Sequence, residues 1–327
     1  MTRTRMLAEP GEHMAEDGSA ARHRLQHLST RVAATNLALW QGRAGARAST
    51  VSEPDAPSLR PDAAEPPNKE AFMTIPSPRV GSVDWSDRTQ GRLTAAETRQ
   101  LLPALARTHV VNAFGRTAML LHLHSGRRAH LPERALRMPS SVLTKTAEQV
   151  AHERLTPALL NHSYRCYSFG VALAALEDVD VDRELLFAAA MLHDTGLSRP
   201  IAGIDFTVAS ARIALDVAET VGLPSAATET MRSAITLHHS PDVSRADGAV
   251  AYLLSAGAGM DVVGLRSWKV PGDVLASVLR DRPRLGFKDE FRSMWSAQVA
   301  AVPRGRARLL RRYGAFDLAI RMAPFDE

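Results

Sequence analysis

The sequence predicts an all-α protein, a bundle of helices joined by short loops. Three observations support this fold class. Apolar residues recur at helical spacing along most of the chain from Pro139 onward. Residues that begin and end helices lie between these stretches. No alternating apolar and polar run is long enough to form a sheet. With 327 residues, 45% of them apolar, the chain can bury one large core or two smaller ones.

We divide the chain into three parts. Residues 1–75 hold many prolines among polar and small residues, and we expect them to form a largely disordered extension with one short helix at 25–40. Its composition also resembles a transit peptide in places, and a translation start at Met73 is a further alternative. Residues 76–138 form a helical lead-in, in which Thr94 and Glu97 make a capping box. Residues 139–315 form the main helical domain.

The helices of the main domain are recognised in order by their ends. Ser140 or Ser141 caps the first, and Thr156 followed by Pro157 begins the second. Gly222 and Pro224 end the fourth, where a helix commonly stops. The expected ranges are 142–153, 157–176, 183–192, 207–221, 225–239, 246–258, 273–280, 288–302 and 306–313.

Composition narrows the class of protein. Cys166 is the only cysteine, so no intramolecular disulfide can form, which fits a reducing compartment. No apolar stretch approaches the ~20 residues of a membrane span, and no secretory leader is evident, so we expect a cytoplasmic protein without membrane contact. The net charge is +5, but acidic residues separate the arginines, which argues against nucleic acid as a partner. A small-molecule substrate is expected, and homo-oligomerisation is left open.

Histidines and aspartates fall on the apolar stripes of four different helices. His162, His193, His238 and Asp261 each continue a run of core residues at three- and four-residue spacing. A single inward histidine is commonly a core residue bonded to a carbonyl, and an inward aspartate can pair with an arginine such as Arg165. Four such residues are explained together by a shared cation. Imidazole and carboxylate ligands suit zinc, iron, manganese or nickel.

The segment Ala190-Met191-Leu192-His193-Asp194-Thr195-Gly196 resembles the signature of the HD superfamily of metal-dependent enzymes. Leu159-Leu160-Asn161-His162-Ser163-Tyr164-Arg165, Phe169-Gly170, Ile235-Thr236-Leu237-His238 and Met260-Asp261-Val262-Val263-Gly264 are similar to its cyanamide hydratase-like branch. The resemblance implies an HD-type metal-binding domain at 139–315. It also implies one divalent ion (zinc, iron or manganese) held by His162, His193, Asp194 and Asp261.

The resemblance also implies a reaction, in which an activated water attacks a small molecule. We expect Asp194 and His238 to be catalytic, although His239 follows directly and could line the site instead. Asn161, Tyr164 and Arg165 are assigned to substrate binding, with pairing to Asp194 or Asp261 as the alternative for Arg165. Hydration of a nitrile-like carbon is expected from the branch. Hydrolysis of a nucleotide or other phosphate ester and a non-catalytic ligand-binding module are the alternatives.

Overall fold

The computed structural model describes residues 78–327, so the predicted extension and its helix at 25–40 lie outside the described residues. Within the described part the protein is all-α, as predicted, and its β-bridges are isolated ones at Arg92–Gly305 and Ile201–Ile204. The α-helices are α2 (Val83–Thr89), α3 (Ala95–Leu120), α4 (Val142–Arg154), α5 (Pro157–Leu176), α6 (Arg183–Leu192), α7 (Phe206–Val221), α8 (Ser225–Leu237), α9 (Ala249–Val263), α10 (Gly272–Asp281), α11 (Phe287–Ala301), α12 (Arg306–Tyr313) and α13 (Phe316–Arg321). Short 3₁₀ helices are η1 (Ser125–Arg128), η2 (Glu133–Leu136), η3 (Arg245–Asp247) and η4 (Ser267–Lys269).

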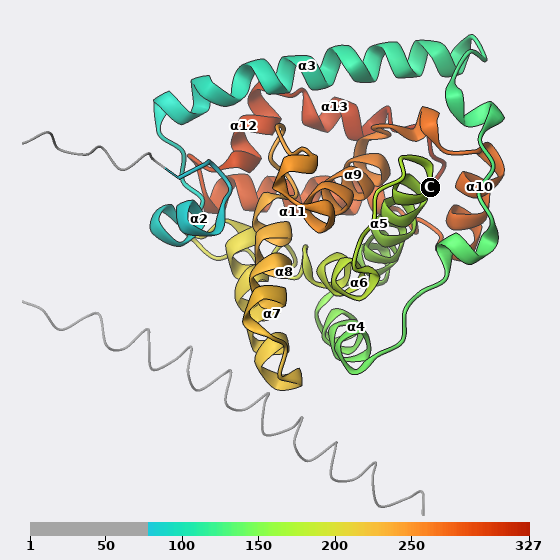
Figure 1. Cartoon of the computed structure of the whole chain (residues 1–327). Helices are drawn as coiled ribbons and strands as arrows, with labels where there is room; N and C mark the ends of the chain where they lie inside the picture. Colours follow the sequence, from blue (N-terminus) through green and yellow to red (C-terminus); the bar gives the residue numbers. More distant parts are fainter. Residues whose placement is uncertain (1–77) are drawn as a thin grey trace, which may run out of the picture. The chain divides into compact units, whose positions relative to one another are not determined.

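Helices α5 and α9 form the centre of residues 78–327. Helices α4, α6, α7 and α8 lie on one side of this pair, and α3, α12 and α13 lie along the opposite edge (Figure 1). Gly257 lets α5 and α9 approach closely, because a Cβ there would overlap the carbonyl of Cys166. The close approach brings His162 of α5 beside Asp261 of α9.

Several expected helices form with the expected ends. Helices α5, α6 and α12 have the predicted ranges, and α4, α7, α10 and α11 differ from prediction by one residue at one or both ends. The Ser141 hydroxyl accepts a hydrogen bond from the backbone of Thr144, which decides between the two candidate caps. The Thr156 hydroxyl caps α5 in the same way, with Pro157 at its first position.

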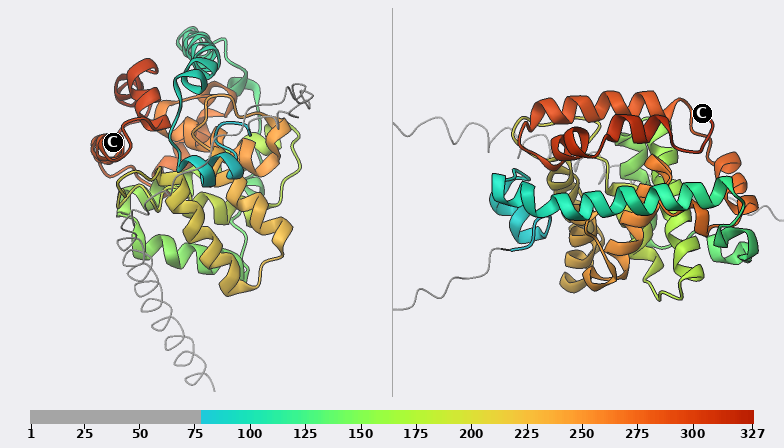
Figure 2. Two further views of the ribbon diagram at one scale, coloured as in Figure 1. Left: turned by 90° about the vertical axis from the view of Figure 1, so that its left-hand side faces the viewer. Right: turned by 90° about the horizontal axis from the view of Figure 1, so that it is seen from above.

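Other helices differ from the prediction for identifiable reasons. The helix expected at 246–258 begins only at Ala249, because Gly248 has a φ of 92° and follows a 3₁₀ turn. It then continues to Val263, so Asp261 lies on the helix. Helix α3 runs as one continuous helix to Leu120 (Figure 2). Gly115 lies within it and packs against the Trp268 ring. Helices α2 and α13 were not predicted.

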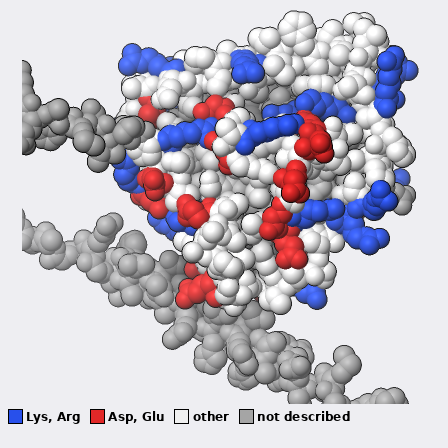
Figure 3. All heavy atoms as spheres, viewed as in Figure 1, with Lys and Arg blue, Asp and Glu red and all other residues white. Residues whose placement is uncertain are grey.

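The basic segment near the C-terminus is divided between surface and core. Arg308, Arg311 and Arg312 are exposed, as expected for a solvated helix face. Arg306 is fully buried instead and donates hydrogen bonds to the Thr236 carbonyl and the Thr207 hydroxyl. On the face drawn in Figure 3, basic and acidic side chains are intermixed. None of the helices described here has the length and continuous apolar character that crossing a bilayer requires.

Glu177, at the end of α5, is hydrogen-bonded to residues of η3, α9 and η4. Its carboxylate accepts hydrogen bonds from Tyr252 at 2.6 Å, Lys269 at 2.7 Å and Arg245 at 2.9 Å. Burial alone would raise its pKa, but these three donors lower the pKa of Glu177 from 4.5 to about 2. A carboxyl group with a lowered pKa stabilises the fold above its unfolded pKa, and this contribution is lost as the pH falls through the folded value.

We therefore expect Glu177→Gln to lower the free energy of unfolding at pH 7 by about 1–2 kcal/mol, allowing for partial solvent screening. The difference between wild type and variant should shrink as the pH falls from 4.5 toward 2. Urea unfolding at several pH values measures it. A difference that stays constant over this range would show that the charge of Glu177 does not contribute.

Candidate metal centre

Two histidines at helix ends are fixed in orientation by their own helices. His193 directly follows α6, and its Nδ1 lies 2.8 Å from the carbonyl oxygen of Ala190. His238 directly follows α8, and its Nδ1 lies 2.8 Å from the carbonyl oxygen of Ile235. A carbonyl can only accept, so Nδ1 carries the proton in both rings. Both Nε2 atoms therefore present a lone pair to whatever they face.

The Nε2 atoms of these two histidines, and that of His162, converge on Asp194. Its Oδ2 lies 3.4 Å from His193 Nε2 and 3.5 Å from His162 Nε2, and its Oδ1 lies 3.7 Å from His238 Nε2. All four side chains are at least nine-tenths buried. Ligand atoms bound tetrahedrally to one transition-metal ion lie roughly 3.3–3.5 Å apart. We call His162, His193, Asp194 and His238 the metal cluster, because each imidazole lies within 3.7 Å of the Asp194 carboxylate, close to that spacing.

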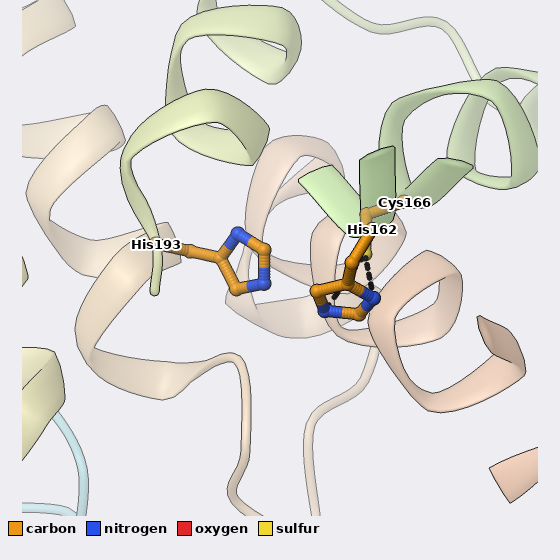
Figure 4. A group of neighbouring side chains, drawn as sticks. All are labelled: His162, Cys166 and His193. Atoms are coloured by element: carbon orange, nitrogen blue, oxygen red, sulfur yellow. Dashed lines mark hydrogen bonds between the residues drawn. The ribbon is translucent and has the colours of Figure 1, made fainter. Parts of the chain in front are cut away.

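One atom of the cluster is a buried acceptor without a donor. Among the described residues, none makes a hydrogen bond with His193 Nε2. A buried polar atom is normally satisfied, and a bound cation would satisfy this one. Two triplets in the described part of the chain each place one candidate ligand atom per residue within 4.8 Å of the others: His193, Asp194 and His238, and His162, Cys166 and His193 (Figure 4). The residues present therefore fit a divalent ion.

Burial and neighbouring charges set the protonation of the cluster. Burial, together with the adjacent His193, lowers the pKa of His238 to about 3, so this imidazole is neutral at pH 7. Burial alone would raise the pKa of Asp194, but His193, His162 and His238 hold it below its ordinary value. Burial alone would lower the pKa of His193 and of His162, but Asp194 raises the pKa of His193, and Cys166, Asp194 and Asp261 raise that of His162, so a cation bound here would take the place of protons on these rings.

Asp261 is fully buried and makes four hydrogen bonds through its carboxylate. Oδ2 accepts from His162 Nδ1 at 2.7 Å and from Arg165 at 2.8 Å. Oδ1 accepts from Arg165 Nε at 2.7 Å and from Arg284 at 2.9 Å. A carboxylate offers about four lone-pair positions, so these partners use its acceptor capacity. Burial alone would raise the pKa of Asp261, but Arg165, His162 and Arg284 hold it far below its ordinary value.

The residues assigned to substrate binding have structural partners. Arg165 pairs with Asp261, which is the alternative stated for it above. Tyr164 donates its hydroxyl hydrogen to Glu148, and Asn161 donates to the carbonyl oxygen of Pro283 at 2.9 Å. None of the three lines the cavity at the metal cluster. Their assignment to substrate binding stays a prediction without a contact to support it.

A cavity of about 140 Å³ opens from the metal cluster. Both His238 and His239 line it, but only His238 lies near Asp194. The opposite wall is formed by α3, α11, α12 and α13, which were not predicted to lie at the site. Aromatic residues at four-residue spacing, Phe287, Phe291 and Trp295, were the available signal.

Residues 159–262 match the family model of the HD domain. The match begins beside His162 and ends beside Asp261, so it spans the metal cluster, but it does not specify a branch of the family. No curated protein matches the chain. An HD domain is thus found at residues 159–262, and HD domains are generally metal-dependent hydrolases.

Proposed function

We propose that the HD domain makes this protein a metal-dependent enzyme, a hydrolase or hydratase that activates water for attack on a small molecule. The observation that carries this proposal is the convergence of three imidazole Nε2 atoms on one buried carboxylate, 3.4–3.7 Å away. The same carboxylate and imidazoles line a cavity large enough for a small organic molecule. A ligand-binding module without turnover would not need this cluster at the base of its cavity.

His162, His193 and Asp194 are the proposed ligands of a divalent ion such as zinc, iron or manganese. Three protein ligands leave a coordination position for water or substrate, as catalytic sites require. When bound, the cation supplies Lewis acidity and lowers the pKa of water toward neutrality. Because its Nδ1 donates to a carbonyl, neutral His238 presents the lone pair of Nε2, which can accept a hydrogen bond from the attacking water and orient it.

We assign Asp261 the role of positioning His162, in place of the direct metal contact implied by the resemblance. Its acceptor positions are used by His162, Arg165 and Arg284, as described above. A carboxylate that accepts from the far nitrogen of a ligating histidine fixes the ring and makes it more basic. The site is thus built by α5, α6, α8 and α9 together.

This assignment predicts a graded effect for Asp261→Asn. We expect metal affinity to fall about 10–100-fold, as for loss of a carboxylate that orients a ligand, while a metal-loaded form can still be prepared. Titration with zinc against a competing chelator measures the affinity. Affinity too weak to load the variant at any practical zinc concentration would instead show that Asp261 binds the metal directly.

The proposed reaction is tested by metal content and a substrate screen on the full chain. We expect about one transition-metal ion per chain by mass spectrometry, and turnover of cyanamide or a small nitrile to the corresponding urea or amide. Turnover should disappear on chelation and return when the metal is restored. Phosphate esters are included in the screen, since the family commonly hydrolyses them. A purified protein that binds no metal would contradict the proposal.

A further inference from the structure

The cavity beyond the metal cluster is built partly by residues outside the HD match. Its far wall comes from α3, α11, α12 and α13, together with the last turns of α9. We call Phe206, Val262, Phe291, Trp295, Phe316 and Ala319 the apolar subsite. These side chains, and not those of the HD signature, would surround the part of a bound substrate that lies beyond the group reacting at the metal cluster.

The apolar subsite has a continuous aromatic wall. The Trp295 ring lies 5.7 Å from Phe206, 5.6 Å from Phe291 and 4.5 Å from Phe316, measured between ring centroids. Phe206, Phe291 and Trp295 are nearly fully buried from solvent. Aromatic rings of this kind favour stacking or edge contact with another flat apolar group.

Apart from the histidines, Asp194 is the one titratable side chain among the lining residues, and no lysine or arginine lines the cavity. The buried guanidinium groups nearby are bonded elsewhere. Arg165 and Arg284 contact Asp261, and Arg306 donates to Thr236, Ser240 and Thr207. A phosphate group in the apolar subsite would therefore be buried without a cationic side chain, which is unfavourable.

Besides His193, two lining side chains hold buried polar atoms that make no hydrogen bond to any described residue: Asn112 at Oδ1, and His239 at both ring nitrogens. His239 stacks on Phe206, with 4.9 Å between ring centroids, and only 6% of its side chain is exposed. Neither ring nitrogen makes a hydrogen bond to any described residue, although His239 Nε2 lies 3.9 Å from Asp205 Oδ2. A buried imidazole without a partner would be satisfied by a polar atom of a bound molecule.

The volume of the cavity limits the size of that molecule. It measures about 140 Å³. An engineered apolar cavity of about 150 Å³ holds benzene. A single ring or a short branched chain therefore fits, whereas a nucleotide does not.

We propose that the apolar subsite binds the ring-sized, uncharged body of a neutral organic substrate, which receives one hydrogen bond from His239. This inference rests on the proposed function for the position of the reacting group, which lies at the metal cluster. It narrows the body of the substrate to an uncharged, ring-sized group, such as that of an aryl or alkyl nitrile or amide, and it excludes a second anionic group that would lie in the apolar subsite.

Calorimetric binding of benzonitrile and phenyl phosphate to the full chain tests the subsite, both metal-loaded and after chelation. We expect benzonitrile to bind in both states, and at least tenfold more tightly than phenyl phosphate to the chelated protein. Tighter binding of phenyl phosphate to the chelated protein, or no binding of benzonitrile in either state, overturns the inference.

Variants locate the binding. Ala319→Leu fills the subsite, and we expect it to lower the affinity for benzonitrile about tenfold. The same change at exposed Ala113 should leave this affinity unchanged. Val262→Ala enlarges the subsite and should improve binding of 2-naphthonitrile relative to benzonitrile. His239→Phe should weaken the binding of 4-hydroxybenzonitrile about fivefold by removing one hydrogen bond, and should leave the binding of benzonitrile nearly unchanged. Unchanged binding of these ligands in Ala319→Leu and Val262→Ala, and of 4-hydroxybenzonitrile in His239→Phe, would place the ligand elsewhere and overturn the inference.

The two proposals fail in different ways. If the protein binds no metal but benzonitrile binds with the expected pattern of variants, the proposed function is wrong and the subsite stands. If metal binds and supports turnover but the variants have no effect on ligand affinity, the subsite is wrong and the proposed function stands.

Discussion

Asp194→Asn is expected to abolish metal binding and to lower turnover about a thousandfold or more. Asp194 is the residue on which His162, His193 and His238 converge, at 3.4–3.7 Å. Asparagine has nearly the same size but carries no charge, and its amide group would direct hydrogens toward the imidazole lone pairs. The loss corresponds to several kcal/mol of transition-state stabilisation that the cation supplies.

Mass spectrometry of the purified variant measures the metal, and the rate with the substrate found by screening measures turnover. Asp289→Asn is the matched control, because the same substitution falls on a side chain that is 91% exposed. It should retain about one ion per chain and full activity. One ion per chain in Asp194→Asn would show that the three histidines, or a site elsewhere, hold the metal without this carboxylate.

Much of the helical framework could be predicted because local signals determine it. Thr156 and Pro157 begin α5, and the apolar stripe of α6 leads directly to His193. The same periodicity placed His162, His193 and His238 on inward faces, and all three are buried beside Asp194. A resemblance to the HD signature added Asp194 itself, and the family match at 159–262 supports that step.

The remaining features depend on contacts between distant segments. The sequence predicts that Asp261 is an inward carboxylate. Only the fold shows that it accepts hydrogen bonds from Arg165 and Arg284, which lie 96 and 23 residues away in the sequence. The cavity wall could not be predicted, because α3, α11 and α13 meet the HD segment through tertiary packing alone. Periodicity shows that Phe291 and Trp295 share a helix face, but it does not show which surface that face covers.

Arg165→Met is expected to lower the free energy of unfolding by about 3–5 kcal/mol, because it leaves a buried carboxylate with too few donors. Arg165 and Asp261 are both fully buried, and their contacts measure 2.7 and 2.8 Å. Arg165 also donates to the carbonyl oxygens of Arg282 and Pro283, which would lose a partner. Arg284 and His162 still contact Asp261, so the effect should lie toward the lower end of this range.

Urea unfolding measures the loss, and Arg280→Met is the control, since that side chain is 72% exposed and should change stability by less than about 0.5 kcal/mol. The double variant Arg165→Met with Asp261→Asn should be less destabilised than the sum of the two single variants, because no uncompensated carboxylate remains.

The same unfolding experiment, together with the kinetics of Arg165→Met, separates the two roles considered for Arg165. A residue that contacts substrate would raise KM and leave stability almost unchanged, whereas a partner of Asp261 lowers stability and, through His162, metal affinity. Additive stability losses in the double variant, or a change confined to KM, would contradict the structural role.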